Sequence, residues 1–250
     1  NPFFTMELLH ALHEEMVLRP VAEGWALGRL DRVVLPSLLR QVIDGRVARL
    51  DEAMQRAIAM AAVIGQEAPL ALWAEVAGLD DETLLTIVER AGDCRLLDAT
   101  PDGRSVRFVH ALTREALYTG VTPPRRRRWH QQVGETLAAV PQPNVDSVAY
   151  HFQAAGDPRA SEWLIAAGTR AQRAYAWLTA AERLRAAAAL LDGVEGQEQV
   201  SGRLACRLAY LLRFSDPAAG IDALEGATRL ARRIGDNALA AEARWLRGLL

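Results

Sequence analysis

The chain has 250 residues, enough for two modest domains or for one domain followed by a short array of repeats. Half of the residues are hydrophobic, which supplies ample material for packed cores. The formal net charge of −2 argues against a large nucleic-acid-binding surface, because such surfaces carry a clear basic excess. No apolar stretch approaches the roughly 20 residues that span a bilayer, and no signal peptide opens the chain. We therefore expect a cytoplasmic protein without membrane contact.

Both ends of the sequence suggest a piece of a longer protein. The chain opens at Asn1 without an initiator methionine, and it stops at Leu249-Leu250 inside a helical pattern. Its two cysteines, Cys94 and Cys206, are far apart and show no metal-binding spacing, which predicts buried thiols.

The first part of the chain is predicted to be helical. Apolar residues recur at helical spacing, and a loop with Pro20 and Gly24 separates the first helix from the second. Asp51 is placed to cap the third helix, and Gly65 to end it. The expected helices cover residues 3–17, 35–43, 51–64, 69–77 and 80–91.

The pattern then changes to that of a β-hairpin. Residues 95–99 and 105–110 flank Pro101-Asp102-Gly103, a strong turn signal, and a helix is expected at 111–118. This hairpin is predicted to be the only sheet of the chain. Three helices, a hairpin and a further helix form the order of a winged-helix-like domain.

Beyond Pro123-Pro124 every segment is predicted to be helical. The stretch that starts at Gly156-Asp157 resembles the one that starts at Gly235-Asp236, an offset of 79 residues or two units of about 40. We therefore predict an α-solenoid of tetratricopeptide-like (TPR-like) helix pairs and, for the whole chain, a mainly α fold. The expected helices cover residues 125–139, 146–155, 158–175, 178–191, 198–212, 217–233 and 237–250.

No catalytic motif is present. The sequence has no phosphate-binding loop, and all 29 of its basic residues are arginine. His10 and His13 have a spacing that suits a metal, but nothing nearby completes a ligand set, and we expect no metal site. The run Arg125-Arg126-Arg127-Arg128 invites a nucleic-acid interpretation, yet four consecutive helical residues point in four directions. A solvated helix that packs through arginine stems is the preferred interpretation.

The winged-helix-like unit raises the nucleic-acid question again, because that fold often binds DNA. Its recognition helix would be residues 80–90, which carry four acidic residues and one arginine. Such a helix would repel phosphates, so we expect no direct nucleic-acid binding by this chain.

Two motifs resemble one protein family. Residues 1–9, read as NPFFTMELL, resemble the "GNPFFxxELL" signature of STAND-class ATPases, which include large LuxR-type transcriptional regulators. Residues 108–118, read as FVHALTREALY, are similar to the "FxHxLxREALY" element at the end of the family's winged helix. The resemblance covers roughly residues 1–190 and implies three parts: residues 1–48 as the end of the ATPase lid, 49–122 as the winged helix, and 123–250 as TPR-like repeats.

The resemblance also implies two nucleotide-binding residues, which would act only in the intact parent. Pro2 would contact adenine, and His110 would reach the phosphates of ADP and lock a closed, inactive state. Ala111 stands where the related "MHD" motif has aspartate, so no carboxylate is available for that lock. For His110 two structural alternatives exist, a cap for the following helix or part of the hairpin core.

The leading hypothesis is a regulatory part of a STAND-type ATPase, with no catalysis of its own and no cofactor besides the ATP or ADP of the parent. In this hypothesis the lid and winged helix communicate the nucleotide state, and the repeats bind a protein or small-molecule inducer. The LuxR-type DNA-binding domain would follow in the parent. The alternatives are a regulatory arm of a nucleotide cyclase or protein kinase, and a plain TPR-type protein-binding scaffold.

Overall fold

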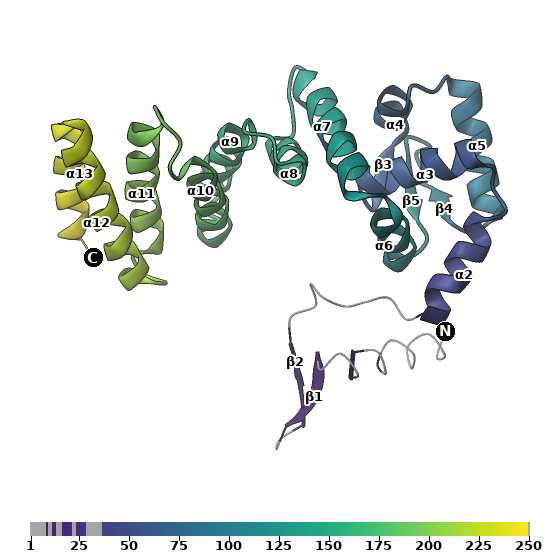
Figure 1. Ribbon diagram of the computed structural model, residues 1–250, viewed down its shortest axis with the longest axis horizontal. Coiled ribbons are helices and arrows are strands. Elements are labelled where there is room, and N and C mark those ends of the chain that lie inside the picture. Colours follow the sequence, from purple (N-terminus) through teal and green to yellow (C-terminus); the bar gives the residue numbers. More distant parts are fainter. Residues whose placement is uncertain (1–8, 10–11, 14–16, 22–23, 29–36, 250) are drawn as a thin grey trace. The chain divides into compact units, whose positions relative to one another are not determined.

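The protein is mainly helical, with two small antiparallel sheets among the residues that the structure describes (Figure 1). The computed structural model describes residues 9, 12–13, 17–21, 24–28 and 37–249. The chain divides into two compact units, Asn1–Trp129 and His130–Leu250. None of the helices in these described ranges combines the length and apolar character needed to cross a membrane.

The first correction concerns residues 18–28, which were expected to be a loop. Strands β1 (Leu18–Val21) and β2 (Gly24–Leu27) pair in antiparallel register, with Leu18 opposite Leu27, so the hairpin further along is not the only sheet. Pro20 is tolerated because a two-stranded ribbon consists of edge strands only. The helix expected at 3–17 lies mostly outside the described residues, although Leu9, Leu12 and His13 are helical.

The next helices follow the predicted capping signals. Helix α3 (Glu52–Ile64) begins at Asp51, whose carboxylate accepts a hydrogen bond from the Met54 amide at 2.8 Å. The following α4 (Leu70–Ala77) ends at Gly78, whose φ of 65° lies in the left-handed region that glycine adopts without strain. These elements confirm the predicted order of helices. The remaining two are α2 (Ser37–Val47) and α5 (Asp81–Asp93).

Two strands of a three-stranded sheet lie between α5 and α6 (Ala111–Gly120) along the chain. The predicted hairpin is confirmed as β4 (Leu97–Ala99) and β5 (Ser105–Phe108), but a third strand, β3 (Glu67–Pro69), pairs with the other edge of β5. The register places Val106 of β5 opposite Ala68 on one side and Ala99 on the other. Strand β5 is therefore the centre of the sheet.

The core of this unit lies between α3, α4, α5 and the sheet. Trp73 of α4 is fully buried, and its indole N–H donates to the carbonyl of Ala57 on α3 at 2.9 Å. That bond satisfies the only polar atom of the side chain, so the large ring is buried without cost from an unpaired donor. The sheet contributes Leu97, Val106 and Phe108 to the same unit, each at most 1% exposed.

Helices make up the rest of the chain, as predicted. Every second helix begins at Pro123, Ala160, Glu198 and Asn237, so these starts lie 37 to 39 residues apart. Prolines 123 and 124 occupy the first turn of α7, where their missing N–H groups cost nothing. The helices are α7 (Pro123–Ala139), α8 (Val145–Ala155), α9 (Ala160–Arg173), α10 (Trp177–Leu191), α11 (Glu198–Leu212), α12 (Pro217–Ile234) and α13 (Asn237–Arg247).

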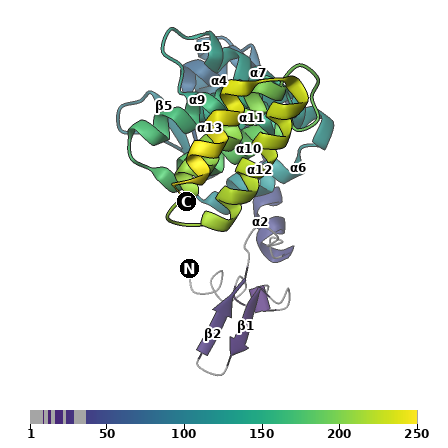
Figure 2. The ribbon, with the colours of Figure 1, turned by 90° about the vertical axis from the view of Figure 1, so that its left-hand side faces the viewer.

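Glycines mark the closest helix contacts in this region. Gly134, Gly168 and Gly202 lie 34 residues apart, each on the first helix of a pair. A Cβ on Gly134 would lie 2.9 Å from the Phe152 ring, and one on Gly168 would lie 2.7 Å from a methyl of Leu184. Gly202 faces Leu239 of α13 even more closely, and α12 and α13 lie side by side in Figure 2. The helices therefore approach at distances that only glycine permits.

Two glycines of this region predict opposite effects of the same substitution. We expect Gly202→Ala to lower the free energy of unfolding by about 1–3 kcal/mol, because the new methyl group meets buried Leu239. Gly226→Ala on α12 should raise it by about 0.5–1 kcal/mol, because only the tip of Arg229 lies near, at 4.0 Å, and alanine favours the helix. Urea denaturation of both variants checks this, and equal effects would contradict the packing described.

Candidate functional site

The end of β5 leads directly to the candidate residue His110. Gln66, which precedes β3, holds this end from one side, because its side-chain amide donates to the Phe108 carbonyl at 2.8 Å and its own carbonyl accepts from the Phe108 amide at 3.0 Å. On the other side, the Val109 amide donates to the carbonyl of Leu96 at 3.1 Å. The backbone that delivers His110 is thus fixed by hydrogen bonds on both edges.

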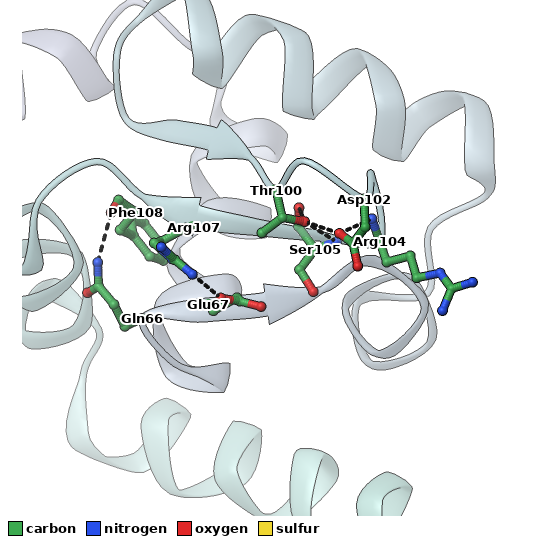
Figure 3. A network of polar contacts seen from close by, with 8 residues as sticks. All are labelled: Gln66, Glu67, Thr100, Asp102, Arg104, Ser105, Arg107 and Phe108. Atoms are coloured by element: carbon green, nitrogen blue, oxygen red, sulfur yellow. Dashed lines mark hydrogen bonds and ion pairs between the residues drawn. The ribbon is translucent and has the colours of Figure 1, made fainter.

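The opposite end of β5 is fixed by its turn (Figure 3). The hydroxyl of Thr100 lies 2.6 Å from the Asp102 carboxylate and 2.9 Å from the Ser105 carbonyl, and it accepts from the Ser105 amide at 3.1 Å. The Arg104 amide donates to the same carboxylate at 3.1 Å. Donation from Thr100 and then from Arg104 lowers the pKa of Asp102. The charged carboxylate is therefore part of what holds the turn together.

An ion pair crosses the sheet between these two ends. The guanidinium of Arg107 on β5 lies 2.7 Å from the carboxylate of Glu67, its register partner on β3 (Figure 3). Both side chains are substantially exposed, at 61% and 44%, so the pair contributes at most about 1 kcal/mol to stability. The guanidinium of Arg107, three residues before His110 in the sequence, therefore already has a carboxylate partner.

His110 itself is exposed at the N-cap position of α6. Its backbone is extended, with φ −136° and ψ 142°, and its carbonyl accepts from the Thr113 and Arg114 amides at 3.0 and 3.3 Å. The imidazole makes no capping hydrogen bond to the helix and is not in the hairpin core. The hairpin-core alternative is therefore wrong, whereas His110 does occupy the cap position of α6 through its backbone, and its side chain is exposed to solvent at the helix N-terminus.

Arg114, one turn further along α6, anchors this helix. Its Nε donates to the carbonyl of Ala62 on α3 at 2.8 Å, and its guanidinium lies 4.7 Å from the ring centre of Tyr118. The hydrogen bond fixes the start of α6 against the end of α3. Arg114 is therefore a residue that anchors α6 on α3, with a side chain only 21% exposed.

A cleft near these elements does not include His110. It has a volume of about 340 Å³ and lies among α2, α3, α6 and the start of α7. Two of its arginines are near carboxylates of their own helices, with Arg40 4.0 Å from Asp44 and Arg56 3.7 Å from Glu52. The structure thus does not bring His110 together with this cleft.

The other candidates from the sequence have varied outcomes. Pro2 and His10 lie outside the described residues. His13 lies with Nδ1 3.1 Å from the Leu18 carbonyl and packs edge-on against Trp25. Within the described ranges no group of three or more His, Cys, Asp or Glu side chains could hold a metal.

The arginine run does not form one surface. Arg126 packs over Tyr118 at 4.6 Å from the ring centre and donates to the Tyr118 carbonyl at 3.4 Å, whereas Arg125 lies 5.9 Å from the ring centre of buried Trp129. These contacts match the predicted helix that packs through arginine stems.

Sequence reasoning missed a buried pair of histidines, His130 and His151, at 0% and 3% exposure. Their Nδ1 atoms lie 2.9 Å apart, so one ring donates and the other accepts, and Tyr150 packs against both rings. A spacing of 21 residues in the sequence gives no sign of this side-chain contact.

Three comparisons with known proteins gave no match: neither the protein-family models, nor the curated proteins, nor the solved structures include a significant relative of this chain. The function proposed below therefore rests on the residues and on the geometry described above.

The turn at Asp102 predicts a pH dependence of stability. The pKa of Asp102 in the folded chain lies below its ordinary value of 3.8, so the charged form favours folding above that pH and loses this effect as the pH falls through the lowered pKa. We expect Asp102→Ala to be less stable than the native chain at neutral pH, with the difference shrinking in acid. Thr100→Val should show the same trend, and a pH-independent difference in thermal unfolding would contradict it.

The two cysteines differ in exposure, which corrects the expectation that both are buried. Cys94 is partly exposed, whereas Cys206 is fully buried and its burial raises the pKa of the thiol to about 11. We expect a thiol-reactive chromophore to label Cys94 in the native protein and Cys206 only after denaturation, because the thiolate is the reacting form. Cys94→Ser is the control and should abolish the labelling of the native protein.

Proposed function

We propose that this chain is a regulatory part of a STAND-type signalling ATPase, of the kind found in large LuxR-type transcriptional regulators. In this proposal residues 1–48 are the end of the ATPase lid, 49–122 a winged-helix-like domain and 123–250 TPR-like repeats. The chain would carry no catalysis of its own. It would couple the nucleotide state of a cytoplasmic parent protein to the binding of a protein or small-molecule inducer.

The observation that carries the proposal is the exposed imidazole of His110 at the junction of β5 and α6. The order of α3, α4, α5, a hairpin and α6 supports a winged-helix interpretation of the unit around it. An N-terminal helix end offers backbone N–H groups and a positive local field, both of which favour phosphate. An imidazole N–H next to that end can add a further hydrogen bond to an anionic oxygen.

The residues on hand fit a nucleotide only in part. His110 would contact the phosphates, and the resemblance assigns the adenine contact to Pro2. Bound ADP would supply negative charge at the start of α6, and His110 would hold that charge by donating a hydrogen bond. Ala111 has no carboxylate, so the lock would depend on the imidazole and the helix end alone.

The acidic surface of α5 supports the expectation that this chain does not contact nucleic acid directly. Asp80, Asp81, Glu82 and Glu89 are all exposed, and the phosphate backbone of DNA repels such a surface. In the proposal the DNA-binding function belongs to another domain of the parent.

The paired helices support the role of the second part. Helix starts 37 to 39 residues apart and small residues at close contacts are typical of TPR-like arrays, which bind partners through their grooves. The same features would serve a regulatory arm of a nucleotide cyclase or protein kinase, or a plain protein-binding scaffold. Nucleotide coupling through His110 is expected for a STAND-type regulator and for a cyclase or kinase arm, but not for a plain scaffold.

The test is the nucleotide content of the protein as expressed from its own gene. We expect the unmutated protein to release ADP when it is denatured, as measured by chromatography. The His110→Ala variant should retain at least about tenfold less ADP after equal washing, because a charge-assisted hydrogen bond is lost. Asp98→Asn, an exposed change on β4, is the control and should retain ADP normally.

Two results would contradict the proposal. Equal ADP in all three proteins would show that His110 does not lock the nucleotide. A native protein without nucleotide would favour the plain scaffold that binds partners through its repeats.

A further inference from the structure

A groove crosses the second unit along α10, α11 and α12. Its volume is about 720 Å³, within the range of small-molecule sites. Small side chains dominate its lining, so a ligand can approach the backbone of all three helices closely. The small residues are Ala188, Ala189, Gly202, Ala205, Ala223, Gly226 and Ala227.

Three arginines line the same groove: Arg185 on α10, and Arg229 and Arg233 on α12. In the part of the chain that the structure describes, none of the three forms an ion pair with a carboxylate. Asp192 is the acidic residue of the lining, so the charged side chains of the groove leave a net positive charge although the chain is acidic overall.

Neighbouring arginines of the same unit behave differently. Arg159 lies 2.7 Å from both Glu135 and Asp157, and Arg203 lies 3.9 Å from Glu242. Carboxylates are thus available to pair with arginines elsewhere in this unit. Arg229 and Arg233 are instead one helical turn apart, where like charges repel each other, and an anion between them would relieve that repulsion.

We propose that this groove binds a small amphiphilic anion. Its apolar body lies on the alanine and glycine floor, and its carboxylate or phosphate group lies among Arg185, Arg229 and Arg233. The volume of the groove and its small floor residues favour such a molecule over a protein surface. This proposal rests on the inducer-binding role proposed above for the repeats, and it names the chemical class of the inducer. Binding itself does not involve His110.

Calorimetric titration of the whole chain with 1-naphthyl phosphate tests the charge and the apolar body together. We expect saturable binding with one site, at least about tenfold weaker binding of 1-naphthol, and weaker binding of inorganic phosphate as well. Arg229→Gln and Arg233→Gln should each weaken naphthyl phosphate binding by about tenfold. Arg232→Gln is the matched control, because Arg232 is exposed on the same helix outside the groove, and it should change binding less than about twofold.

A further variant separates a ligand site from a merely structural groove. Gly226→Leu should abolish binding without unfolding the chain, because a Cβ there meets only the end of Arg229.

Several outcomes would overturn the proposal. They are no binding of 1-naphthyl phosphate at millimolar concentration, equal weakening by Arg232→Gln, or full affinity in Gly226→Leu. Displacement of the probe by a glutamate-rich peptide at lower concentration than naphthyl phosphate itself would identify a protein partner instead. Loss of ADP retention in His110→Ala with unchanged probe binding leaves this site standing, so the two proposals fail separately.

Discussion

Close approach between helices is the constraint on which the second unit depends. At Gly134, Gly168 and Gly202 a bulky side chain of another helix occupies the space that a Cβ would need. Since interhelix distance follows the side chains at the contact, hydrogen at these positions brings the backbones together. The buried positions nearby can then hold only small residues, such as Ala180 and Ala227. The alanine-rich composition is therefore a geometric consequence of the packing, and it also creates the shallow floor of the groove.

The sequence predicted those parts of the fold that depend on local signals. Asp51 and Gly65 begin and end α3, which residue type alone favours, and both appear in the structure as expected. The hairpin around Asp102 follows for the same reason. Strand β3 was missed because Glu67-Ala68-Pro69 is too short to show alternation and is stabilised by pairing with β5, which is far along the chain. The β1–β2 ribbon was missed because Pro20 and Gly24 indicate a loop as readily as a turn between edge strands.

The candidate sites, too, could be predicted from the sequence only where local signals point to them. His110 could be singled out because it stands in a recognisable motif, but its exposure depends on how β5 and α6 meet. The groove could not be found in this way. Its arginines come from two helices, and each has the sequence surroundings of an ordinary solvated helix face. Whether a carboxylate of another helix lies within reach of an arginine is decided by tertiary contacts alone.

All basic residues of the chain except histidine are arginine, and the chemistry of the guanidinium explains these contacts. A guanidinium stays charged, stacks on aromatic rings and binds carboxylates through bidentate hydrogen bonds, so one residue type can serve both packing and recognition. Arg126 stacks on Tyr118, and Arg159 covers the Phe152 ring. Arg159 also donates hydrogen bonds to the carboxylates of Asp157 and Glu135. These bonds raise the pKa of Arg159 and lower the pKa values of both carboxylates. Arginines engaged in this way have donors committed to the fold. Those of the groove have theirs uncommitted within the described chain, and a planar group with uncommitted donors beside an apolar floor is what an amphiphilic anion requires.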